Sequence, residues 1–375
     1  MKNVKKLVLV LALAGLVTSA VLTTTALATS KTKKAASVDV CALLPDTKSS
    51  VRWQLFDQPL LEAAFKAAGV SASVLNAQGD PQQQKTDADT CITNGAKVIL
   101  LTNLDSSSGA AIEAAAAAKG VKTIDYDRLT LGGKAAYYVS FNNVTVGKIQ
   151  GAGLVAAMKA KGMIGAGKKP IVAELSGSPT DNNATLFSHG AHLILDPLFK
   201  KGVIKKGPHQ SVPGWDNQKA LTIFEQMLTK TGNKIDAVLA ANDGLGGAVV
   251  TALKSHKLKP KPTTGQDATP VGVQNIISGW QSMTVYKAVP LEAKAAANAA
   301  IAMIKGTKVA TNGTTHDSTG NRDVPSILAV PVIINRANYQ KLFTDKFISK
   351  SDVCVGAYKK FCKTYKTPYP NSQGK

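Results

Sequence analysis

An alternation of short apolar runs with longer amphipathic stretches restricts the fold of this chain more than any other feature. From residue 38 onward, runs such as VDVCALL (38–44) and KVILLT (97–102) are largely apolar and have the length of a strand. Stretches such as QPLLEAAFKAAG (58–69) carry apolar residues at helical spacing and end at a glycine. A repeated strand–helix unit with apolar strands predicts a parallel sheet covered by helices on both faces.

The same alternation restarts near residue 142. TVGKIQGAGLVAAMKAKG (145–162) has the pattern of a helix, and PIVAEL (170–175) and IDAVLAA (235–241) have the pattern of buried strands. Two half-chains with one pattern predict an α/β protein with two similar doubly wound parallel-sheet domains.

The chain is expected to cross between these domains several times, which would make a hinge. A late helix at 291–306 would return to the first domain, and VPSILAVPVIIN (324–335) would close the second. We therefore expect an N-terminal lobe of residues 38–141 plus 288–315, a C-terminal lobe of 142–287 plus 316–340, and a basic tail with a Cys pair at 341–375.

The first 28 residues have the features of a signal peptide. A basic start precedes a 16-residue apolar run, and ALA at 26–28 fits a small-residue cleavage site. Alternatively, this segment is not cleaved and anchors the protein in the membrane. No later segment approaches the roughly 20 apolar residues of a membrane span. We expect an exported protein, in the periplasm or at the outer face of the cell membrane.

The chain is strongly basic, with a formal net charge of +21. Such a charge raises the question of nucleic acid, but the lysines are scattered in pairs and form no stripe with aromatic residues. A solvated cationic surface facing an anionic cell envelope explains the charge, and no nucleic-acid partner is expected.

Four cysteines in an exported chain suggest pairing. Cys354 and Cys362 lie in one short segment, CVGAYKKFC, and can close a small loop in the tail. Cys41 and Cys91 then remain to form the second bond. This is one of three possible pairings. The spacings do not resemble metal-binding knuckles, so no metal site is expected.

Polar and aromatic side chains gather where the predicted strands end. Ligands of open α/β sheets bind beyond the carboxyl ends of the strands. The loop after PIVAEL ends in three consecutive polar residues, Asp181, Asn182 and Asn183. Asn182 is expected to cap the start of the helix, which leaves Asp181 and Asn183 for a ligand. Charged groups hydrogen-bond hydroxyls strongly, and indoles cover apolar ring faces, so the set suits a small neutral polyol. Its members are Arg52, Trp53, Asp127, Arg128, Asp181, Asn183, Trp215, Asn242, Asp267 and Lys287.

At these positions the chain resembles the periplasmic sugar-binding proteins of ABC importers of the ribose/galactose type (periplasmic binding protein type I), and among them the xylose-binding members most. The likeness extends from about residue 38 to about residue 335. It is carried, in this order, by VRW, YDR, YYVSFNN, SGSPTDNNATLF, NKIDAVLAANDG, TGQDA and MTVYK. LLPDTKSS before VRW and the tail after 335 depart from the family pattern.

The resemblance implies a role for each candidate residue. Trp53 and Trp215 would sandwich a pyranose. The polar members would hydrogen-bond sugar hydroxyls, with Arg52 and Arg128 in the first domain and Lys287 at a domain crossing. The implied protein captures a monosaccharide, a xylose-like aldose, and delivers it to an ABC permease. The alternative is a sugar-sensing module that signals to a membrane receptor or kinase. We expect a monomer without cofactor.

Enzymatic readings are less well supported by the sequence. Asp127 and Asp181 resemble a glycosidase carboxylate pair, but Arg128 and the nearby amides would keep both ionised. No G-x-S-x-G elbow is present. GMIGAGKK (162–169) lacks the Ser or Thr of a phosphate loop. His192 has no acidic partner close to it in the sequence and is expected to be an ordinary core or surface histidine.

Overall fold

The computed structural model describes residues 37–165 and 167–363. The predicted signal peptide at 1–28 and the last twelve residues of the tail lie outside these residues. Within the described part of the chain, no helix is long and apolar enough to cross a membrane.

The first sheet has seven strands, and all neighbouring pairs are parallel except one antiparallel pair at an edge. Such a sheet is the predicted outcome of the strand–helix repeat. Its order is β10 (Gly313–Asp317), β11 (Arg322–Ala329), β5 (Tyr137–Phe141), β4 (Lys122–Tyr126), β3 (Val98–Leu101), β1 (Val40–Leu44) and β2 (Ala72–Asn76).

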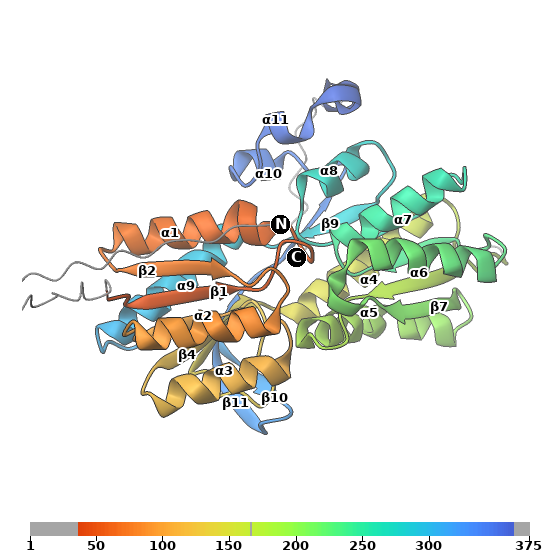
Figure 1. Ribbon diagram of the computed structural model, residues 1–375. Coiled ribbons are helices and arrows are strands. Elements are labelled where there is room, and N and C mark those ends of the chain that lie inside the picture. The colour runs from red at the N-terminus through yellow and green to blue at the C-terminus, as the bar shows by residue number, and fades with distance from the viewer. Residues whose placement is uncertain (1–36, 166, 364–375) are drawn as a thin grey trace, which may run out of the picture. The chain divides into compact units, whose positions relative to one another are not determined.

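Helices cover both faces of this sheet. Figure 1 shows α1 (Gln58–Ala67) on one side of β1 and α2 (Pro81–Thr93) on the other. Alternate residues of β1 enter separate cores: Val40 packs with α1 and α9 (Val289–Ile304), whereas Leu43 packs with α2 and α3 (Ser106–Ala118). Two apolar faces explain why the strand is apolar throughout.

Both expected disulfides are present. Cys41 of β1 bonds to Cys91 of α2 inside the core shared with α3, and Cys354 bonds to Cys362 in the tail. The first bond closes a separation of 50 residues and the second a separation of only 8. The longer loop gains more from the cross-link, because more conformational freedom is removed from the unfolded chain.

The second sheet repeats this plan with fewer regular strands. Its parallel part is β7 (Lys205–Ser211), β6 (Ile171–Ser176) and β8 (Ala237–Ala240). Beyond β8, a bridge from Val238 to Thr263 and a bond from the Val285 N–H to the Gly265 carbonyl extend the hydrogen bonding toward β9. The antiparallel pair β9 (Met283–Tyr286) and β12 (Val332–Asn335) completes it.

Helices also cover both faces of the second sheet. α4 (Asn143–Ala160) and α5 (Asn182–Lys200) pack on one face, and α6 (Asn217–Lys230) and α7 (Asp243–Ser255) on the other. α4 and α5 approach very closely, since a Cβ added to Gly147 would lie 2.0 Å from the Phe187 carbonyl oxygen. A glycine therefore fixes the position of α5, whose first turn carries site residues.

The strand β11 corrects the expected lobe boundaries. Residues 316–340 were expected to close the second domain, but β11 pairs in parallel with β5 of the first sheet, and only β12 joins the second. Pro331, between the two strands, has no N–H and interrupts an otherwise continuous apolar run. The chain thus crosses between the sheets after β5, after β9 and after β11.

The tail forms short helices against the second sheet and the start of α1. α10 (Lys341–Thr344) and α11 (Lys350–Val353) lie near α8 (Pro270–Ile277) in Figure 1. Phe347 is buried, with ring centroids 4.5 Å from Phe56 and 4.8 Å from Tyr286. The tail therefore packs on residues that belong to both halves of the chain.

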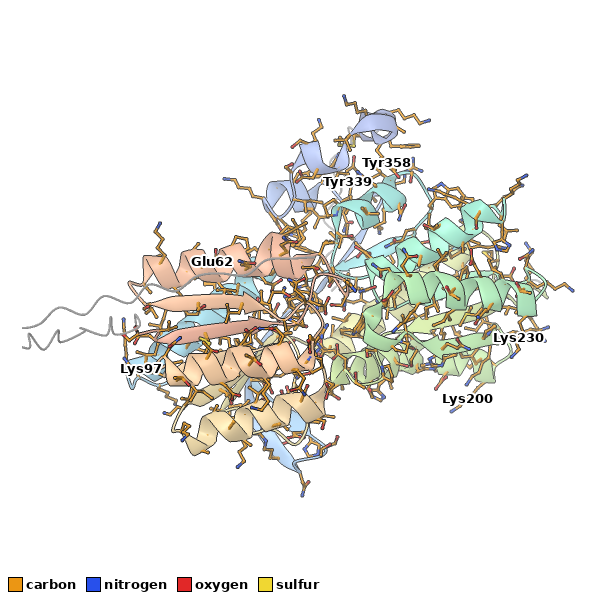
Figure 2. All side chains as sticks on the ribbon, in the orientation of Figure 1. Glu62, Lys97, Lys200, Lys230, Tyr339 and Tyr358 are labelled. Atoms are coloured by element: carbon orange, nitrogen blue, oxygen red, sulfur yellow. A yellow bond between two sulfur atoms is a disulfide. The ribbon has the colours of Figure 1, made fainter. Side chains whose placement is uncertain are left out.

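Three of the described lysines illustrate where positive charge lies on the surface. Lys97, Lys200 and Lys230, labelled in Figure 2, lie on separate elements and are exposed.

Candidate functional site

The structure brings all ten predicted residues around one cavity of about 20 Å³. They come from both halves of the chain and from the ends of strands or the starts of helices, as expected for an open α/β sheet. Four further residues in the wall were not singled out by the sequence analysis: Ser49, Ser50, Phe187 and Gln266.

Arg52 is held almost entirely by protein carboxylates. Its Nε and Nη2 donate to Asp57 at 2.9 and 2.6 Å, Nη2 also donates to Glu292 at 2.6 Å, and Nη1 donates to Asp127 at 2.7 Å. Burial alone would lower the pKa of Arg52, but these three carboxylates raise it well above its usual value. Since guanidinium has five N–H donors, one on Nη1 is left for a ligand.

Asp127 is the carboxylate at the centre of the cavity wall. Its Oδ2 accepts from Arg52 and, over 3.1 Å, from Lys287, and the residue has a φ of 63°. Burial would raise the pKa of Asp127, but Lys287, Arg52 and Arg128 hold the pKa well below its ordinary value. Asp127 is therefore ionised throughout the physiological pH range and cannot donate a proton in a hydrolytic reaction.

Asp181 joins an arginine, a tryptophan and a helix. Its Oδ2 lies 3.0 Å from Arg128 Nε in an ion pair and accepts from Trp215 Nε1 at 3.0 Å. Its Oδ1 accepts the Asn183 backbone N–H, so Asp181 itself is the N-cap of α5. The expectation that Asn182 caps the helix was wrong, because Asn182 is the first helical residue and Asp181 is the cap. One carboxylate performs both tasks, because its two oxygens accept from different partners.

Asn183 is fully occupied by protein groups. Its Nδ2 donates to the Asp127 carbonyl at 2.8 Å, and its Oδ1 accepts from Asn143 at 2.8 Å and from Tyr138 at 3.2 Å. In this arrangement its amide holds α5 to the end of β4.

Asn242 and Asp267 both contact the loop that follows β1. Asn242 caps α7 with its Oδ1 and donates from Nδ2 to the Ser49 carbonyl at 3.0 Å. Asp267 accepts from Ser50 Oγ at 2.9 Å, and its Oδ1 lies 3.7 Å from Lys287 Nζ. The bonds to Ser49 and Ser50 join residues 193 and 217 positions apart, so the sequence could not show them.

The two indoles have different neighbours. Trp53, on the π-helix η1 (Trp53–Asp57), has the Arg52 guanidinium 4.4 Å from its ring centroid. Trp215 lies edge-on to Phe187 and has a φ of 55°. It packs directly on Gly177, where an added Cβ would come within 2.1 Å of the indole. Gly177 thus makes room for the ring.

A second polar cluster lies apart from the cavity and corrects the expectation for His192. Its Nε2 contacts Glu174 Oε2 at 3.0 Å, and its Nδ1 contacts Asp196 Oδ1 at 2.9 Å. Burial would lower the pKa of His192, but the two carboxylates raise it. One partner is four residues away on the same helix, and the other is on β6 and could not be recognised from spacing alone.

Comparison with known proteins agrees with this geometry. A family model described as a periplasmic binding protein domain matches residues 41–308. The D-xylose-binding periplasmic protein of Escherichia coli K12 is 32% identical over 304 residues, which cover 80% of this chain and 88% of that protein. The multiple sugar-binding periplasmic receptor ChvE of Rhizobium radiobacter is 31% identical, with 82% and 89% covered.

Solved structures show the same fold. An ABC transporter solute binding protein from Clostridium phytofermentans with bound β-D-glucose superposes with a TM-score of 0.77 at 29% identity, covering 84% of this chain and 99% of that one. A carbohydrate transporter solute binding protein from Chloroflexus aurantiacus in complex with D-glucose gives 0.76, also at 29% identity, with 84% and 98% covered. The chain therefore belongs to the periplasmic binding protein family.

Proposed function

We propose that this protein captures a monosaccharide in the cavity and delivers it to an ABC import permease. The observation that carries the proposal is the composition of the wall. Arg52, Arg128 and Lys287 face an equal number of carboxylates, those of Asp127, Asp181 and Asp267. A wall with balanced charge favours a neutral ligand, and its many charged groups suit a ligand rich in hydroxyls.

The ligand we propose is a xylose-like aldose. The relatives in the comparison include a xylose-binding protein, and the structural neighbours hold glucose. Trp53 and Trp215 would cover the faces of a pyranose. We propose as ligand contacts the ten residues predicted from the sequence. Arg52 would contribute the single N–H that its carboxylate partners leave free, and Asn183, whose amide is occupied by protein groups, would contribute van der Waals contact.

Binding would require the walls to separate. A cavity of about 20 Å³ holds little more than one water molecule, and a pyranose is several times larger. We propose that the lobes built on the two sheets open about the three crossing segments and close on the sugar. The ion pairs now made across the cavity, such as Arg128 with Asp181, would then be shared with sugar hydroxyls.

Export and delivery complete the proposal. The relatives include periplasmic proteins and ABC transporter components, and the sequence begins with the features of a signal peptide. The second candidate function is sugar sensing, in which closure is read by a membrane receptor or kinase. It is favoured by one observation, the likeness to a sugar-binding periplasmic receptor. A non-enzymatic role is supported by the relatives and structural neighbours, which are binding proteins.

Titration calorimetry of the mature chain with pentoses and hexoses tests the proposal. We expect binding of at least one aldose at micromolar concentration, which corresponds to about 8 kcal/mol. A protein that is folded by circular dichroism but gives no heat and no thermal shift with any aldose would overturn it. Pull-down from membranes with the closed, sugar-bound form would separate a permease partner from a receptor.

A further inference from the structure

Two side-chain oxygens of consecutive residues that line the cavity have no hydrogen-bond partner among the described residues. They are Oε1 of Gln266 and Oδ1 of Asp267. Gln266 is 3% exposed and Asp267 is 5% exposed, and both line the cavity. Asp267 was expected at the site from the sequence, whereas Gln266 was not.

A buried amide oxygen without a partner costs free energy. The cost arises because the group has given up its hydrogen bonds to water without replacing them. Eight buried side-chain atoms of this kind occur among the described residues, and only those of Gln266 and Asp267 belong to residues that line the cavity. Partners for these two oxygens can therefore be supplied by a molecule that enters the cavity.

The backbone around Gln266 is fixed on both sides. Its carbonyl accepts the Asp243 N–H at 2.9 Å, and the next N–H, of Asp267, donates to the Val285 carbonyl at 2.9 Å. The Asp243 carboxylate then accepts from the backbone N–H of Thr269 at 2.8 Å. The segment from 266 to 269 is thus attached to α7 and to β9, which limits how far the Gln266 side chain can move to find another partner.

We propose that Gln266 contacts the ligand and determines its specificity, by accepting a hydrogen bond from a sugar hydroxyl beside the one bound by Asp267. This inference rests on the proposed function and narrows it. The ligand is then a neutral polyol with at least two hydroxyl groups, one that donates to Gln266 and one that donates to Asp267. A sugar that lacks either hydroxyl leaves a buried acceptor unpaired.

The test uses Gln266→Met, which keeps the length of the side chain and removes the acceptor. We expect the Kd of the best sugar to rise at least tenfold, with an unchanged or higher Tm of the unliganded protein, because the unpaired oxygen is gone. Gln84→Met is the matched control. Gln84 is also a buried glutamine with an unpartnered Oε1, but it lies in α2 and does not line the cavity. This control should leave the Kd unchanged.

Deoxy sugars identify the hydroxyl. The wild-type protein should lose affinity for one monodeoxy analogue, and Gln266→Met should bind this analogue and the parent sugar with nearly equal affinity. The inference is overturned if Gln266→Met binds the parent sugar within twofold of wild type. It is also overturned if the substitution lowers the Tm and weakens all analogues equally, as a structural role predicts. Failure of the wild-type protein to bind any sugar would instead overturn the proposed function and this inference with it.

Discussion

Arg128 and Asp181 form an ion pair of 3.0 Å, between Nε and Oδ2, that joins the end of β4 in the first sheet to the start of α5 beside the second. The side chain of each is nearly fully buried. The guanidinium also donates to the Asn103 carbonyl at 3.1 Å, and the carboxylate also accepts from Trp215. The pair therefore connects the two halves of the chain through groups that are themselves fixed in place.

Asp181→Asn is expected to weaken sugar binding about 10- to 100-fold. The substitution removes one charge from the pair with Arg128, and removing one partner of a buried charge pair costs several kcal/mol. The helix should survive, because Asn caps helices as well as Asp does. Titration calorimetry measures the affinity, and circular dichroism checks the fold. An unchanged Kd would exclude Asp181 from the site.

Gly177→Ala should also lower the affinity, by displacing Trp215. A Cβ at Gly177 would lie 2.1 Å from two atoms of the indole, so the ring must move. We expect a weaker Kd and a shifted tryptophan emission maximum. Gly247→Ala on α7 is the matched control, since an added Cβ there meets nothing within 4 Å. If both variants bind alike, the position of Trp215 does not matter for binding.

Asp243 should make stability depend on pH. Burial, with a contribution from the Asp267 carboxylate, raises the pKa of Asp243 to about 7. Between the unfolded pKa of about 4 and this value, the folded state keeps a proton that the unfolded state releases. The contribution of Asp243 to the free energy of unfolding therefore falls as the pH rises, by up to about 1.4 kcal/mol per pH unit. Above about pH 7 this contribution no longer changes with pH.

Asp243→Asn should remove that slope. Asn has the shape of Asp, and a half-turn of the Gln281 amide would let its oxygen accept from the new amide nitrogen while the remaining oxygen accepts the Thr269 N–H, so the variant is expected to fold. Urea unfolding of both proteins between about pH 4 and pH 8 gives the difference. Parallel pH profiles for wild type and variant would show that Asp243 does not titrate in this range.

Phe347→Ala should destabilise the protein by about 3–5 kcal/mol, the usual cost of emptying a buried aromatic site. The ring contacts Phe56 of η1 and Tyr286 of β9, so the loss falls on both halves of the chain. Phe347→Leu, which fills part of the space, should cost less. Urea unfolding checks the order of the three proteins. Equal stability of all three would mean that the tail contributes nothing to the fold.

Much of the arrangement follows from local pattern. Apolar runs of strand length and helical spacing identify the elements, because burial on both faces of a parallel sheet requires them. The position of a residue after a strand then places it at the carboxyl edge, which is why residues as distant as Arg52 and Lys287 could be expected around one cavity. The cysteine pairing followed from the short tail segment.

The partners of each side chain were decided by tertiary structure. Arg52 donates a hydrogen bond to Glu292, 240 positions away, and Asp127 accepts one from Lys287, 160 positions away. No spacing rule reaches that far. The same holds for β11, whose apolar run continues into β12 although the two strands join different sheets. An apolar run of strand length identifies a strand in the sequence. Only the packing of the whole chain decides which other strand pairs with it.

The sequence by itself determined the type of fold, the edge at which a ligand would bind and most of the side chains found there. Tertiary structure alone decided which of them have hydrogen-bonding capacity left for a ligand. Asn183 is fully occupied and Arg52 nearly so, whereas Gln266 has an unpaired oxygen. Hydrogen-bond satisfaction is a property of pairs of groups in space, and a chain specifies those pairs only once it has folded.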